Sequence, residues 1–195
     1  MWATQLCVTK GAMGPNGEVN TPTFRAVVPE SAGDAITLDF LFHGRSQDTR
    51  GLASGSVRQQ IGLKLRAADG CNLLYLMWRM DLSYLEGSVK LNPGARRHSE
   101  CGPRGYTKIV PSLVHRLSLQ PGSRHQLRGQ VRGDALQGFV DGKLVWQGTL
   151  PYVSQTLVGL AGIRSDNLAY EIVSVWVTPA TMPIGTPHCA ADGED

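Results

Sequence analysis

The stretch Arg124–Leu150, RHQLRGQVRGDALQGFVDGKLVWQGTL, decides the fold of this chain. It predicts three consecutive β-strands, because two tight turns, RGD at 132–134 and DG at 141–142, separate segments in which apolar or small residues alternate with polar ones. In an Asp-Gly pair both residues can take positive φ, as the type I′ turn of a two-residue hairpin requires. Such a meander indicates an antiparallel sheet with one buried face.

Further strand candidates lie on both sides of this meander. Alternation is clearest in Ala35–His43 and Arg58–Ala67, and Val158–Arg164 and Leu168–Thr178 complete the set. Cys71–Met80 is apolar on both faces, which predicts a central strand covered by the second sheet on one side and by loops or a ligand on the other. Roughly a dozen strands around one core exceed an immunoglobulin-type sandwich, so we predict an all-β, two-sheet antiparallel β-sandwich of the jelly-roll type.

Length and hydropathy predict a single domain outside the membrane. The 195 residues suit one β-sandwich domain, which we place at residues 1–178. Residues 179–195 are expected to form a C-terminal tail, which a disulfide through Cys189 would tie back. No apolar run approaches the roughly 18 residues of a transmembrane helix, and no signal peptide is visible in this chain. The sequence gives no indication of the oligomeric state.

The charge of the chain is mildly basic and uneven. The formal net charge is +3, and basic side chains gather in the loop Asn92–Tyr106 and in the segment Arg124–Arg132. No stripe of interleaved basic and aromatic residues follows, so nucleic acid is not an expected partner. Solvated surface charges explain the two groups, and so does an anionic ligand such as an acidic glycan.

The four cysteines indicate disulfides more than a metal site. They are Cys7, Cys71, Cys101 and Cys189, and no two of them have the C-x2-C spacing of a zinc knuckle. An even number permits two disulfides in three pairings. In sandwiches whose terminal strands lie side by side, Cys7–Cys189 and Cys71–Cys101 is the natural pairing. Free buried thiols remain the alternative.

The meander and its flanks resemble the concanavalin A-like lectin/glucanase superfamily, including its LamG-type members. The resemblance rests on HQLRGQV at 125–131, LQGFVDGKLV at 136–145, VGL at 158–160 and YEI at 170–172. It covers about residues 112–178 well and the rest by strand spacing alone, with a layout most similar to the alginate-lyase-like jelly rolls. It implies the jelly-roll fold. Function has to be argued from a site, because this fold carries lectins, binding modules, hydrolases and lyases.

The catalytic motifs of these relatives are missing. Their hydrolases carry two Glu separated by an Asp on one strand, and no such stretch occurs here. Their lyases use a Q-I-H strand, whereas this chain has Gln60-Ile61-Gly62, and the region that should supply a Tyr acid/base reads VGLAG at 158–162. We therefore predict no catalytic residues and favour a protein that is not an enzyme. A lyase using Tyr75, Tyr106 or His98 instead, or an atypical hydrolase, remains an alternative.

Two regions are candidate ligand-binding sites. Trp78 could stack on a sugar ring, with Arg79 and Asp81 as hydrogen-bonding neighbours; the alternative is a core tryptophan, which is also the expectation for Trp146 and Trp176. The long loop Asn92–Tyr106 is the other region, since long loops in compact domains are often functional. Its candidate residues are Arg96, Arg97, His98, Arg104 and Tyr106. A structural loop pinned by Cys101 explains the same residues.

No cofactor or metal is expected. Calcium is common in the superfamily, but the aspartates here fall in predicted turns and form no D-x-D-x-D pattern. We therefore predict non-catalytic recognition of a glycan or polysaccharide by a lectin-like module, with acidic polysaccharide as one ligand class. The expected location is secreted, cell-surface or periplasmic. The alternatives are a polysaccharide lyase or hydrolase with an atypical site, and a structural or assembly domain without a small ligand.

Overall fold

The computed structural model of this protein describes residues 6–29 and 31–179. Its twelve strands form one curled antiparallel sheet, with a four-residue helix α1 at His98–Cys101 and a 3-10 turn at Tyr152–Ser154. The strands are β1 Cys7–Lys10, β2 Glu18–Val28, β3 Ser31–Arg45, β4 Gln60–Ala67, β5 Leu73–Arg79, β6 Tyr84–Lys90, β7 Tyr106–Lys108, β8 Pro111–Val114, β9 Arg124–Arg132, β10 Ala135–Val140, β11 Lys143–Thr149 and β12 Leu160–Pro179. The predicted all-β jelly-roll sandwich is confirmed.

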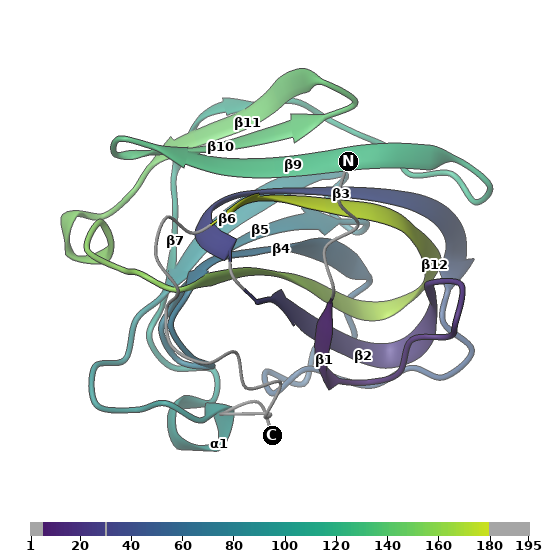
Figure 1. The fold of residues 1–195 in the computed structure, drawn as a ribbon, viewed down its shortest axis with the longest axis horizontal. Coiled ribbons are helices and arrows are strands. Elements are labelled where there is room, and N and C mark those ends of the chain that lie inside the picture. Colours follow the sequence, from purple (N-terminus) through teal and green to yellow (C-terminus); the bar gives the residue numbers. More distant parts are fainter. Residues whose placement is uncertain (1–5, 30, 180–195) are drawn as a thin grey trace.

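The sheet folds back on itself to give two layers (Figure 1). One layer has the order β7-β6-β5-β4-β12-β2-β1, and the other has the order β12-β3-β9-β10-β11-β8. Strand β12 belongs to both, because its first half pairs with β4 and its second half pairs with β3. The hydrophobic core fills the space between the layers.

Strand β12 differs from the expectation of two strands separated by a turn. It is one strand of 20 residues, and Asp166, which we expected in a turn, lies within it. The chain bends at Asn167, whose φ is 57°, a conformation that Asn tolerates better than most residues. Pairing with β2 continues on both sides of this position, so the strand is not interrupted.

The meander has the predicted geometry. Asp141 and Gly142 have φ values of 50° and 77°, both positive as a type I′ turn requires. Gly129 and Gly138 face each other across β9 and β10 on the buried side. A Cβ at Gly138 would lie 3.0 Å from the side chain of Leu76, so the small residues of the meander allow the opposite layer to approach closely.

Strand β5 is buried on both faces, as predicted. Leu74, Leu76 and Trp78 belong to the core between the layers, and Leu73, Tyr75 and Met77 form a separate cluster on the outer side. Of the other two tryptophans considered, Trp146 is a core residue as expected. Trp176 is not a core residue: it is 42% exposed, because side chains alternate along β12 and its neighbour Val175 takes the buried face.

One of the two expected disulfides lies within the described residues. Residues 180–195 lie outside the described residues, and so does Cys189 with the expected Cys7–Cys189 pairing. The other expected disulfide, Cys71–Cys101, is present and closes a loop with a sequence separation of 30. No helix in the described ranges is long and apolar enough to cross a membrane.

Candidate functional site

The candidate site is a cavity of about 590 Å³ on the outer face of the layer that contains β4, β5 and β6. Tyr75 and Met77 of β5, Gln60 of β4, Arg164 of β12 and Tyr106 of β7 line it. These strands are neighbours in the sheet, and strand geometry places every second residue on the same face. The outer apolar face of β5 therefore borders a cavity, and loops form the sides of this cavity.

Asp166 organises the charged side chains beneath this cavity. It is completely buried, and its carboxylate accepts hydrogen bonds from Arg25 Nη2 at 2.7 Å, Gln60 Nε2 at 2.6 Å and Arg164 Nε at 3.1 Å. Burial raises the pKa of this carboxyl, but the two arginines and the Gln60 hydrogen bond outweigh it and lower the pKa to about 2. Asp166 is therefore a fixed negative charge at neutral pH.

Arg164 is held in one orientation by contacts on several sides. Its Nε donates to Asp166, its guanidinium carbon lies 4.9 Å from the centre of the Tyr75 ring, and its Nη1 lies 3.5 Å from the Tyr106 hydroxyl. Tyr75 and Tyr106 themselves stack, with ring centres 6.0 Å apart. Burial lowers the pKa of Arg164, and the charge of Asp166 more than offsets this, so the pKa is raised and the guanidinium stays charged.

A row of side chains crosses the site in register. Lys10 of β1 pairs with Arg25 of β2, and Arg25 pairs with Arg164 of β12. Across the next two strands Arg164 is followed by Gly62 and Met77. Gly62 leaves room for the neighbouring Met77 side chain, whose Sδ lies 2.7 Å from where a Cβ at position 62 would be.

The lining of the cavity is strongly cationic. Six lysine and arginine side chains line it, whereas Glu86 is its one carboxylate in the described part of the chain. The cations are Lys10, Arg25, Arg50, Arg58, Lys108 and Arg164. Glu86 accepts from Lys108 at 3.0 Å and from Arg79 at 3.3 Å, so its charge is already shared by two cations. The cavity lining therefore carries an excess of positive charge.

One wall of the cavity is formed by residues 50–54 together with Arg58. The side chain of Asn167, at the bend of β12, holds this wall in place. Its Oδ1 accepts from the backbone N–H of Arg50 at 2.7 Å, and its Nδ2 donates to the carbonyls of Arg50 and Arg58 at 2.9 and 2.8 Å. The same bend therefore joins the two layers and positions two cationic residues.

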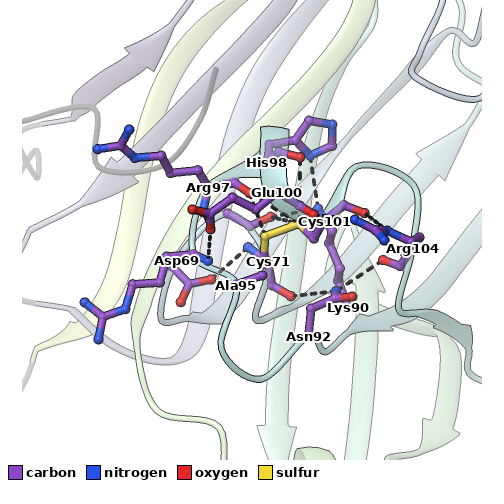
Figure 2. Close-up of a disulfide and its surroundings, with 12 residues drawn as sticks. Asp69, Cys71, Lys90, Asn92, Ala95, Arg97, His98, Glu100, Cys101 and Arg104 are labelled. Atoms are coloured by element: carbon purple, nitrogen blue, oxygen red, sulfur yellow. Dashed lines mark hydrogen bonds between the residues drawn. A yellow bond between two sulfur atoms is a disulfide. The ribbon is translucent and has the colours of Figure 1, made fainter.

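The opposite wall belongs to the loop that the sequence singled out. Figure 2 shows the Cys71–Cys101 disulfide anchoring this loop and its short helix α1 to the start of β5. Asn72 Nδ2 donates to the carbonyl of Ala95 at 2.9 Å, and the backbone N–H of Asn92 donates to Asn72 Oδ1 at 2.9 Å. The loop is consequently fixed by both covalent and hydrogen-bonded contacts.

His98, at the start of α1, lies where this wall meets the cavity. Its Nδ1 lies 3.0 Å from Nζ of Lys90, a buried side chain that also donates to the carbonyl of Gly70 at 2.8 Å (Figure 2). Burial, followed by the positive charge of Lys90, lowers the pKa of His98. The imidazole is therefore neutral at neutral pH.

The structure separates the predicted binding residues into two groups. His98 and Tyr106 line the cavity, so the loop does contribute to it. The other loop residues lie elsewhere: Arg96 and Arg97 are exposed, Figure 2 shows Arg97 pointing outward, and Arg104 donates to the carbonyls of Glu100 and Cys101. Arg104 therefore stabilises the loop, Arg96 and Arg97 lie on its surface, and none of the three lines the cavity.

The structure places the predicted binding residues of β5 and its end away from the cavity lining. Trp78 is 1% exposed and lies in the core, so the core alternative describes it and it is not available to stack on a sugar. Side chains alternate along a strand, and the aromatic residue that faces the cavity is Tyr75. Arg79 and Asp81 form an ion pair at the end of β5, outside the cavity lining.

Sequence reasoning missed the centre of the site. Arg25, Arg164 and Asp166 were not singled out, although a charged pair at alternate positions within an apolar strand is a recognisable signal of a buried ionic network. The turn assigned to Asp166 hid that signal. In the described residues, no three His, Cys, Asp or Glu side chains are grouped so as to hold a metal ion.

Comparison with known proteins supports the fold. The chain is similar to the carbohydrate-binding module CBM66 from Bacillus subtilis, with 14% identity, a TM-score of 0.61, and coverage of 89% of this chain and 94% of that one. A galectin from Caenorhabditis elegans is similar at 14% identity, a TM-score of 0.46, and coverage of 85% and 99%. A tetrameric galectin from the ball sponge Cinachyrella is similar at 12% identity, with a TM-score of 0.48 and coverage of 80% of this chain and 99% of that one. No family model and no curated protein sequence matches the chain.

Proposed function

We propose that this protein binds a glycan in the cavity on the outer face of β4, β5 and β6 and does not transform it. The observation that carries the proposal is the combination of an aromatic floor, in which the 39% exposed ring of Tyr106 stacks on the buried ring of Tyr75, with polar and cationic walls in a cavity of about 590 Å³. Aromatic rings suit the apolar face of a sugar, and a few convergent polar groups fix its orientation. A carbohydrate-binding module shares the fold, which agrees with this function.

We further propose that the ligand is an acidic polysaccharide and that the protein works outside the cytoplasm. The six cations of the lining favour a negatively charged sugar over a neutral one. The Cys71–Cys101 disulfide is typical of proteins in an oxidising compartment, such as secreted, cell-surface or periplasmic ones. Membership of the concanavalin A-like superfamily remains a proposal based on the meander.

The test of glycan binding is a glycan-array screen followed by calorimetry with two tyrosine variants. Tyr106→Ala removes one ring of the floor, and we expect about a 10-fold loss of affinity for whichever glycan binds. Tyr152→Ala removes a ring that is 85% exposed and lies outside the cavity, so this matched variant should bind like the wild type. Equal affinities for all three proteins, or no binding to any glycan, would contradict the proposal.

A second candidate function is elimination on a uronate polymer. His98, Tyr106 and Arg164 line the same cavity, and a base, a hydroxyl and a group that neutralises a carboxylate are what such a reaction needs. Hydrolysis is less well supported, because Glu86 is the single carboxylate lining the cavity within the described ranges. Mass spectrometry of uronate polymers after incubation separates the functions. Shortened chains with unsaturated ends would show that the protein is a lyase.

A further inference from the structure

We propose that the guanidinium of Arg164 is the receptor for an anionic group of the ligand, either a sugar carboxylate or a sugar sulfate. This inference rests on the proposed glycan-binding function, and it assigns the charge recognition to one side chain. It differs from a general attraction between a basic face and an acidic polymer, because a single preorganised guanidinium distinguishes an acidic sugar from its neutral counterpart.

The orientation of Arg164 is fixed before any ligand arrives. Asp166 holds its Nε, the Tyr75 ring lies against its guanidinium, and the Tyr106 hydroxyl is near its Nη1. Nη2 makes no hydrogen bond to the residues that the structure describes, and Arg164 lines the cavity. In this proposal the Nη1–Nη2 edge receives the carboxylate or sulfate, and little side-chain entropy is lost on binding because the side chain is already held in place.

Among the described residues, the positive charges beneath the cavity outnumber the negative ones. Two arginines, Arg25 and Arg164, share the single negative charge of Asp166, and all three lie at low exposure, with side-chain values of 11%, 12% and 0%. Arg25 is further occupied by the carbonyls of Phe24 and Ser165, at 2.8 and 2.7 Å. A positive charge of low exposure without its own counter-ion is costly, so an anionic group at Arg164 would complete the network.

The surroundings of Arg164 fit an anion carried on a sugar ring. Lys10 lies in the same cross-strand row, one strand beyond Arg25, and adds positive potential. The Tyr75 ring lies against the guanidinium and is itself buried, whereas the Tyr106 ring, which stacks on Tyr75, is 39% exposed and has its hydroxyl near Nη1. A sugar could therefore place its apolar face on Tyr106 while its carboxylate or sulfate reaches Arg164.

The test is calorimetry on the full chain with matched acidic and neutral ligands. The probes are a uronate oligosaccharide with its methyl ester, and a sulfated oligosaccharide with its desulfated form. Arg164→Gln should weaken binding of the acidic ligand by about 10- to 100-fold, the range expected for a charge-assisted hydrogen bond, and leave the neutral ligand unchanged. Arg132→Gln removes the same charge from an exposed site on the other layer and is the control.

Folding is checked by thermal melts of every variant. If Arg164→Gln does not fold, Arg164→Lys keeps the inference testable, because it keeps the positive charge and removes the two-pronged guanidinium. We expect that variant to weaken acidic ligands by about 10-fold, since at least one charge-assisted hydrogen bond is lost. Unchanged affinity in Arg164→Lys would then count against the inference.

The outcomes separate this inference from the proposed function. Preference for one acidic ligand that depends on Arg164 supports the inference, and the uronate and sulfate arms show which anion is recognised. Equal binding of acidic and neutral glycans, unaffected by Arg164→Gln, would overturn the inference and leave glycan binding intact. Binding of inorganic sulfate or acetate through Arg164, with no binding to any glycan, would overturn the proposed function and leave the anion site.

Discussion

Replacing Asp166 by Asn is the most informative single perturbation of this protein. The carboxylate is fully buried and compensates two arginines at once, with contacts of 2.7 Å to Arg25 and 3.1 Å to Arg164. The amide keeps the size of the side chain but leaves two cations of low exposure without a negative charge. Removing one partner of a buried ionic network typically costs about 3–5 kcal/mol, which corresponds to a decrease in Tm of roughly 6–20 °C for a chain of this size.

The assay is urea unfolding at neutral pH, followed by circular dichroism, on three proteins. Asp39→Asn is the matched control, because Asp39 pairs with Arg124, whose side chain is 60% exposed, and such pairs contribute about 0–1 kcal/mol. We therefore expect a large loss for Asp166→Asn and a small one for Asp39→Asn. Losses of similar size in the two variants would refute the reasoning that Asp166 compensates the arginines.

The same residue predicts a pH dependence. The pKa of Asp166 falls from 3.8 in the unfolded chain to about 2 in the folded one, so its ionisation stabilises the fold fully above about pH 5. This stabilisation, about 2 kcal/mol, is lost as the pH falls through 3.8 towards 2. In Asp166→Asn this component of the pH profile should be missing. A variant whose stability falls as steeply as the wild type between pH 5 and 2 would contradict the assignment.

Two further changes test the scaffold around the site. Replacing Cys71 and Cys101 by Ala opens a loop with a sequence separation of 30. We expect the free energy of unfolding to fall by about 3–4 kcal/mol and glycan binding to weaken. A loss below about 1 kcal/mol would show that hydrogen bonds alone hold the loop. Gly87→Ala places a Cβ 2.3 Å from the ring of the buried Trp146 and should cost about 1–3 kcal/mol in urea unfolding, whereas Ser88→Ala on the same strand should change stability by less than about 0.5 kcal/mol.

Much of the fold could be predicted because its signals are local. The Asp141-Gly142 turn and the alternating Leu, Gly and Val residues of β9 and β10 specify a hairpin irrespective of the rest of the chain. The doubly apolar β5 likewise indicated a strand with something over each face, and Tyr75 and Met77 do line a cavity there.

The face of a strand could not be assigned in the same way. Both faces of β5 are apolar, so the sequence does not say whether Trp78 or Tyr75 faces the core. Trp176 presented the opposite problem, since an aromatic residue in an apolar strand was expected inside and is 42% exposed. In both positions the decision depends on which layer covers the strand, and this is a long-range property.

The sequence by itself therefore determined the all-β sandwich, the hairpin turns and the absence of the known catalytic motifs, and it predicted that the loop that ends at Tyr106 is functional. The tertiary structure alone decided the site. Arg25, Gln60 and Arg164 come from three different strands, and they meet at Asp166 because β12 pairs with β2 on one side and β4 on the other. A buried charge acquires its partners through sheet register over more than a hundred residues, and no local pattern in the sequence encodes that register.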